Sequence, residues 1–206
     1  PTTKPSPIKI VTKVPTKPFT PTKTPTPTRI PTPTIDPKFV MNPDDTQIGL
    51  SVKIPGVGEG GNRAPRNLSR KIQIDVYDQE NDLIKSGTGF LIYDNGFFRG
   101  IIHLGQLPNN TYYLKVFGPN TLQMTVEPIF QQISNDRLNI LPNVNLLTGD
   151  LDTNNILNLE DYAIALSCFQ DNTCETQESI DFNDDGKTDV TDYNLLLQNF
   201  WRFQGD

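Results

Sequence analysis

Two acidic stretches in the last third of the chain carry oxygen-bearing side chains in the same order. Each is twelve residues long, and the second begins 31 residues after the first. In both, aspartate or asparagine occupies positions 1, 3, 5, 9 and 12. These residues are Asp150, Asp152, Asn154, Asn158 and Asp161 in the first stretch and Asp181, Asn183, Asp185, Asp189 and Asp192 in the second. Hard oxygen donors at alternate positions of a short loop can surround a divalent cation.

Calcium fits this spacing. The ion takes about six to eight oxygen ligands, and an EF-hand-type loop adds the backbone carbonyl of position 7 to its side-chain ligands. Those carbonyls belong to Ile156 and Lys187. Position 6 requires a positive φ, which Gly186 adopts without strain and Asn155 tolerates. One such loop alone is equally consistent with an acidic surface turn. Because two loops agree, we predict two bound calcium ions.

Each loop precedes apolar residues at helical spacing. They recur at intervals of three and four residues, and the second set repeats the first after 31 residues. The pattern predicts two short helices, each packed on one face. Its residues are Tyr162, Ala165, Leu166 and Phe169 in the first helix and Tyr193, Leu196, Leu197 and Phe200 in the second.

Residues 149–206 resemble a dockerin domain. The Gly149-Asp150 opening of the first loop and the aspartate at position 12 of both loops match that family. The resemblance implies a small all-α module, folded by calcium, that binds a protein partner, in the best-known cases a cohesin. It also implies that loop positions 10 and 11 contact the partner. These positions hold Leu159, Glu160, Val190 and Thr191, so they differ between the two loops.

The only cysteines are Cys168 and Cys174, at the end of the first predicted helix and shortly after it. A close pair of cysteines beside loops that require extracellular calcium concentrations predicts one disulfide in an oxidising compartment. Two free thiols are the alternative.

Residues 1–43 form a Pro/Thr-rich tail or linker that holds 12 of the 18 prolines and seven basic residues against one acid. Repeated Pro-Thr favours an extended polyproline II spacer, and such runs resemble O-glycosylated stalks. Inside this segment, alternating β-branched residues are typical of a strand. A strand of this kind can be donated to the sheet of another molecule. Its residues are Ile8, Ile10, Thr12 and Val14.

Residues 44–148 predict an all-β, immunoglobulin-like sandwich of about seven strands. Asp94-Asn95-Gly96 predicts a tight hairpin. The stretch 107–116 resembles the strand entry of prealbumin-like and immunoglobulin-like domains related to carboxypeptidase regulatory domains, which implies a fold and no activity. The predicted strands are Gln47–Ile54, Lys71–Tyr77, Gly89–Tyr93, Phe97–Leu104, Tyr112–Phe117, Leu122–Val126 and Asn139–Leu146.

The formal net charge of −6 is unevenly distributed, because residues 149–206 hold 13 acids against two bases. That excess suits cation-binding loops and argues against a nucleic-acid surface, which needs a basic patch. His103 is the sole histidine and lies in a predicted strand, and no HExxH or CxxC motif occurs. We therefore predict no enzymatic activity. No stretch approaches the roughly 18 apolar residues of a membrane span.

Together these features predict a multi-domain, non-catalytic protein of the extracellular space or cell surface, divided at residues 1–43, 44–148 and 149–206. Its calcium-stabilised module would associate with a cohesin-like domain or with copies of the chain itself. One alternative is a filament subunit whose tail is donated as a strand. Another is a carbohydrate-binding accessory fragment of a larger glycan-active enzyme, with Tyr93, Phe97 and Tyr113 as candidate aromatic contacts.

Overall fold

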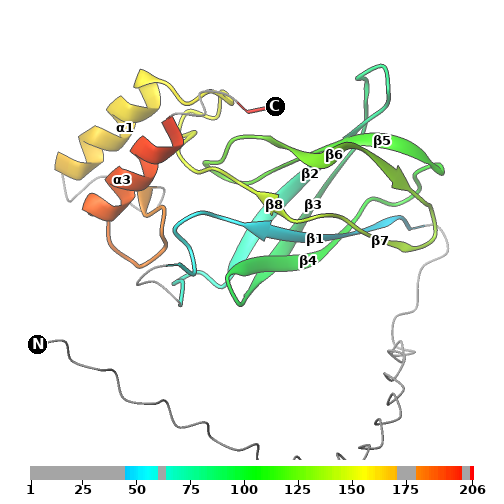
Figure 1. Ribbon diagram of the computed structural model, residues 1–206, viewed down its shortest axis with the longest axis horizontal. Coiled ribbons are helices and arrows are strands. Elements are labelled where there is room, and N and C mark those ends of the chain that lie inside the picture. The colour runs from blue at the N-terminus through cyan, green and yellow to red at the C-terminus, as the bar shows by residue number, and fades with distance from the viewer. Residues whose placement is uncertain (1–44, 60–63, 171–179, 201–204) are drawn as a thin grey trace, which may run out of the picture. The chain divides into compact units, whose positions relative to one another are not determined.

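The computed structural model describes residues 45–59, 64–170, 180–200 and 205–206. These residues lie within one compact unit, Val40–Asp206. Among the described residues, the strands come first and the helices α1 and α3 follow (Figure 1). We call residues 45–148 the β part and residues 149–206 the loop–helix part. The predicted tail strand lies outside the described residues.

Within the described ranges the β part has eight strands in one continuous sheet, of which seven follow the order β6-β5-β2-β3-β4-β1-β7 and the eighth, β8, also pairs with β1. Neighbouring strands are antiparallel, except that β7 and β8 pair in parallel with the two ends of β1. The strands are β1 (Gln47–Lys53), β2 (Ser69–Tyr77), β3 (Leu83–Asp94), β4 (Phe97–His103), β5 (Asn110–Phe117), β6 (Met124–Ile133), β7 (Leu138–Ile140) and β8 (Val144–Asn145).

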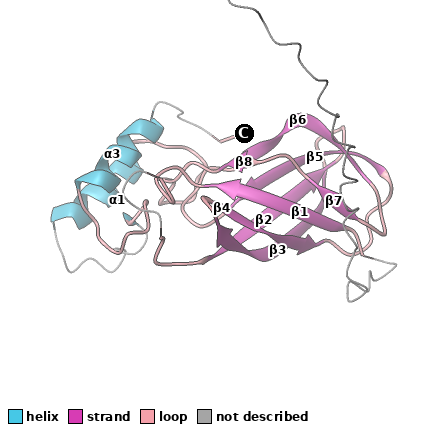
Figure 2. Ribbon diagram, turned by 60° about the horizontal axis from the view of Figure 1, so that its bottom comes forward, coloured by secondary structure: helices cyan, strands magenta, loops and turns pink. Residues whose placement is uncertain are grey.

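One hydrophobic core fills the β part. The alternating residues of β2 and β5 point into it, and they pack with residues of β1, β4 and β6 in a single cluster. The sheet must therefore curl around the core, which makes the β part sandwich-like (Figure 2). Each large apolar side chain buried there contributes about 1.5–3 kcal/mol. The central members are Ile48, Ile72, Ile74, Val76, Leu91, Phe98, Ile102, Leu114 and Val116.

Four predicted strands match β1, β2, β4 and β5 to within two residues at each end. The Asp94-Asn95-Gly96 hairpin is confirmed, since Asn95 and Gly96 have φ values of 48° and 85° between paired β3 and β4. Three predictions were less accurate. β3 starts at Leu83, β6 runs to Ile133, and the predicted strand 139–146 is split into β7 and β8 around Pro142, which cannot donate to a ladder.

The loop–helix part contains α1 (Leu159–Gln170) and α3 (Val190–Asn199), as the helical spacing predicts. Ala165 and Leu196 are buried between them. Aromatic rings close the contact edge to face, with Tyr162 and Tyr193 centroids 6.2 Å apart and Phe169 and Tyr193 centroids 5.8 Å apart. Neither described helix is long and apolar enough to cross a membrane.

The two parts are packed together at several points. Leu157 at position 8 of the first loop is buried against Leu122 and Leu147 of the β part. The side-chain amide of Asn199 in α3 donates to the Thr148 carbonyl at 2.8 Å. The loop–helix part is therefore held by contacts with the β part as well as by its own packing.

Candidate metal-binding loops

The first loop gathers three carboxylates. Ligand oxygens of Asp150, Asp152 and Asp161 all lie within 4.8 Å of one another. Asp161 is fully buried and Asp150 is 4 % exposed, yet Oδ1 of Asp150 has no hydrogen-bond partner among the described residues. A buried carboxylate oxygen without a hydrogen-bond donor is energetically unfavourable. A bound cation would remove that cost at Oδ1 of Asp150.

The two loops share one set of internal hydrogen bonds, displaced by 31 residues. The amide of position 6 donates to the first aspartate, at 3.1 Å in the first loop and 2.7 Å in the second. The amide of position 7 donates to the side chain at position 5, at 2.7 and 2.9 Å. The amide of position 9 donates to the aspartate at position 12, at 2.9 Å in both. The same backbone amides therefore order the same loop positions in both copies.

The backbone repeats in the same way. At position 6, Asn155 and Gly186 have φ values of 64° and 87°, as the sequence predicts. At position 4, Thr153 and Asp184 also have positive φ, 61° and 59°. Left-handed φ is uncommon for residues other than glycine. Agreement at both positions therefore indicates that the two loops share one conformation and are not unrelated turns.

Burial dominates the electrostatics of the loops. It raises the pKa of Asp150 and of Asp181, although the backbone amides of Asn155 and Gly186 donate to them and lower it in part. Burial also raises the pKa of Asp192 to about 6. By contrast, the amide of Thr191 holds the pKa of Asp189 below its usual value. Burial thus disfavours the charged form of Asp150, Asp181 and Asp192.

All twelve predicted ligand residues lie in these two loops, but ligation of an ion stays a prediction. A hard cation fits the donor set, because every side-chain donor is an oxygen and one buried oxygen lacks a partner. Asp192 also completes a capping box with Asp189 at the start of α3, so the same carboxylate orders the helix.

The remaining predicted site residues fall in different places. Leu159 and Val190 are 77 % and 69 % exposed at the first turns of α1 and α3, and Glu160 and Thr191 beside them are also exposed. Cys168 is buried in α1. Its predicted partner Cys174 and the tail residues Ile8, Ile10, Thr12 and Val14 lie outside the described residues, so the disulfide and the donated strand stay predictions.

The candidate aromatic contacts for a glycan do not share one face. Tyr93 packs edge to face on Phe98 beside the core, and Phe97 lies under Arg99. Tyr113 pairs instead with Tyr77, at a centroid distance of 5.8 Å on β5 and β2. His103 at the end of β4 contacts Asp45.

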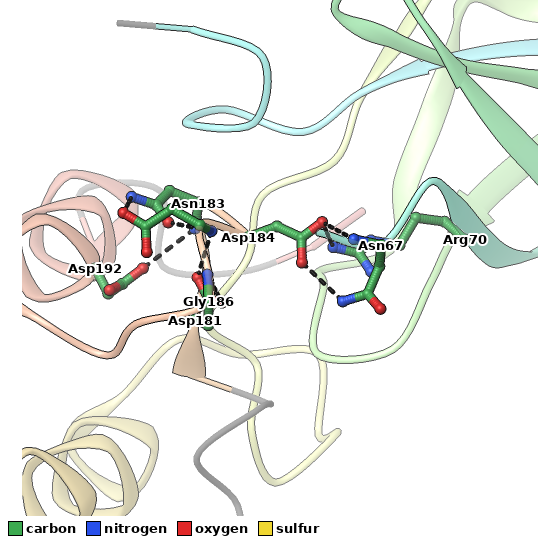
Figure 3. A network of polar contacts seen from close by, with 8 residues as sticks. Asn67, Arg70, Asp181, Asn183, Asp184, Gly186 and Asp192 are labelled. Atoms are coloured by element: carbon green, nitrogen blue, oxygen red, sulfur yellow. Dashed lines mark hydrogen bonds and ion pairs between the residues drawn. The ribbon is translucent and has the colours of Figure 1, made fainter. Parts of the chain in front are cut away.

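Sequence reasoning missed the residues that attach the loops to the β part. Asp184 of the second loop bonds Asn67 and pairs with Arg70, as Figure 3 shows. In the first loop, Oδ1 of Asn155 accepts the Gln123 amide at 2.7 Å. The sequence held one hint of this attachment: position 4 is an acid, Asp184, in the second loop and a threonine, Thr153, in the first.

No protein-family model matches the chain, and no curated protein matches it. Similar solved structures include two crystal structures of interface mutants of a type II cohesin–X–dockerin complex from Acetivibrio cellulolyticus. The N-terminal interface mutant is 17 % identical with a TM-score of 0.49, and the C-terminal interface mutant is 18 % identical with a TM-score of 0.48. Each comparison covers 74 % of this chain and 94 % of the other.

Proposed function

We propose that this chain is a non-catalytic, extracellular assembly protein whose loop–helix part binds two calcium ions and associates with a protein partner. The observation that supports it best is the agreement of the two loops in hydrogen bonds and in φ, together with the unpartnered buried oxygen of Asp150. An acidic surface turn has no need of either feature.

Calcium would supply the positive charge that the loops lack. In the first loop, Asp150, Asp152 and Asp161 would bind through carboxylate oxygens, and Asn154 and Asn158 through side-chain oxygens. Asp181, Asn183, Asp185, Asp189 and Asp192 would do so in the second loop. The carbonyls of Ile156 and Lys187 would complete the two sets. Ion binding would then stabilise the folded loops against carboxylate repulsion.

The proposed partner surface is centred on Leu159 and Val190. Both side chains are large, apolar and mostly exposed, and each occupies position 10 of its loop, where the following helix begins. Exposed apolar residues beside a rigid helix start can be buried by a partner. The dockerin resemblance implies a cohesin-like domain as that partner, and a second copy of the chain is the other candidate. Loops of this kind are filled at the calcium concentrations of the extracellular space.

Isothermal titration calorimetry of the chelator-treated chain tests the metal. We expect two calcium ions per chain, one ion for Asp181→Ala, and weaker binding of magnesium, which keeps its water shell. At free calcium about 100 times the dissociation constant, each site should add about 2.7 kcal/mol to the free energy of unfolding. A melting temperature that is the same with calcium and with chelator would refute the proposal.

The partner is tested with the double variant Leu159→Asp/Val190→Asp. Binding to a panel of cohesin domains is measured by biolayer interferometry, and self-association by sedimentation velocity, each with calcium and with chelator. We expect calcium-dependent binding that the double variant loses while it keeps two calcium ions. Phe90→Asp/Ile92→Asp, at apolar positions of β3 that are 67 % and 55 % exposed, serves as the matched control.

A further inference from the structure

Asp184 sits at position 4 of the second loop, which supplies no ligand in the proposed calcium site. It is only 2 % exposed and has a φ of 59°. Figure 3 shows its carboxylate directed away from Asp181 and Asp192, toward Asn67 and Arg70 of the β part. A charged side chain buried outside the ion site requires a different explanation from ligation.

The β part satisfies this carboxylate completely. The backbone amide of Asn67 donates to Oδ2 at 2.9 Å, and its side-chain amide donates to Oδ1 at 2.7 Å. Arg70 Nη2 lies 3.1 Å from Oδ2. The Arg66 amide also donates to the Asp184 carbonyl at 2.9 Å. Hydrogen bonds to a charged group in a buried site are among the stronger interactions in a protein.

Arg70 is itself held in place. Its guanidinium carbon lies 5.5 Å from the centre of the Phe98 ring, and Phe98 is a core residue of β4. A fixed guanidinium beside Asp184 therefore offsets an additional negative charge next to the loop.

Asp184 is flanked in the chain by Asn183 and Asp185, which are positions 3 and 5 of the loop. Fixing the backbone at position 4 in its left-handed conformation also fixes the direction of both neighbours. The backbone of positions 3 to 5 is then already ordered before the ion binds. Binding therefore costs less conformational entropy, which strengthens it. The first loop has no such arrangement at position 4, where Thr153 is exposed with a φ of 61°.

We propose that Asn67 and Arg70 of the β part act through Asp184 as positioning residues that set the calcium affinity of the second loop. This inference rests on the proposed calcium binding. Asn67 and Arg70 would then support the second site without touching the ion. Substitutions at position 4 should therefore change calcium affinity in the second loop but not in the first.

Calcium titration by calorimetry, on variants of the 206-residue chain, tests this proposal for each loop separately. In the Asp150→Ala background, which retains the second site, Asp184→Ala and Arg70→Met should each weaken binding by about tenfold, equivalent to ~1.4 kcal/mol. Thr153→Ala is the matched control at position 4 of the first loop, and in the Asp181→Ala background it should change calcium affinity at that first site less than twofold. In the Asp181→Ala background, which retains the first site, Asp184→Ala should leave the affinity unchanged, whereas general destabilisation would weaken both sites.

Arg70→Met keeps the side-chain stem over Phe98, so it separates the loss of charge from the loss of packing if Asp184→Ala fails to fold. An Asp184→Ala or Arg70→Met variant that binds at the second site with the parent affinity would overturn the proposal. Equal weakening at both sites would overturn it as well. A parent that binds no calcium at either site would overturn the proposed function too, so the two failures are distinguishable.

Discussion

Lowering the pH from 7 to 5 should weaken calcium binding at the second loop by about tenfold. Asp192 is fully buried, and this burial raises its pKa to about 6. Calcium needs the ionised carboxylate at position 12, so a proton on Asp192 competes with the ion. With a pKa of about 6, roughly nine in ten of these side chains are ionised at pH 7 but only about one in ten at pH 5.

The metal-free protein should show the opposite trend. The folded pKa of Asp192 lies above the ordinary value of 3.8, so the protonated carboxyl favours the folded state. That stabilisation is fully present below about pH 3.8 and is lost as the pH rises through about 6. Chelator-treated protein should therefore lose stability from this group between pH 4 and pH 6, the window in which calcium begins to bind.

Calorimetry of the Asp150→Ala variant at pH 5, 6 and 7 measures the effect at the second loop alone. Asp192→Asn is the control, because its side chain cannot take up a proton in this range and its weaker binding should vary less with pH. An affinity at pH 5 within twofold of that at pH 7 would show that Asp192 does not titrate in this window.

Three further predictions concern other features. Leu157→Ala should lower the free energy of unfolding in urea by about 2–5 kcal/mol, because it leaves a cavity between the first loop and the β part. Leu159→Ala, at an exposed position, should change that free energy by less than about 0.5 kcal/mol. Non-reduced mass spectrometry should find Cys168 and Cys174 joined; two alkylated thiols would contradict this. Deletion of residues 1–16 should abolish any calcium-dependent filaments seen by electron microscopy if the tail is a donated strand, and unchanged filaments would favour the spacer.

Sequence patterns predicted the β part well where alternation was regular. They failed for β3, which starts at Leu83, before the predicted start at Gly89, and contains both Gly87 and Gly89. A side chain at Gly87 would come within 2.5 Å of Leu104, and one at Gly89 within 2.9 Å of Ile102. These glycines allow close approach of chain segments within the sheet and do not end the strand. Pro128 similarly obscured β6, which tolerates it as the end strand of the sheet order.

The two repeated loops could be predicted because the spacing of their oxygen-bearing residues is local, whereas ligation of calcium by those residues stays a prediction. The attachment of the loops could not be predicted. Asn67 and Asp184 are separated by 117 residues, and no local pattern links an asparagine before β2 to a loop before α3. Nor does helical periodicity distinguish the buried Leu196 from Leu197, which is 37 % exposed in the same predicted stripe.

The long separation between Asn67 and Asp184 also has a consequence for the order of folding. Contacts between distant residues form late, because a long loop must close before they can stabilise anything. The segment 66–70 takes its position only once β2 has joined the sheet, and β1 is completed by β7 and β8, which follow much later in the chain. In a polypeptide made from its amino-terminal end, the second loop is therefore among the last structures to be completed. An ion would then bind the second loop only after the rest of the unit Val40–Asp206 has folded.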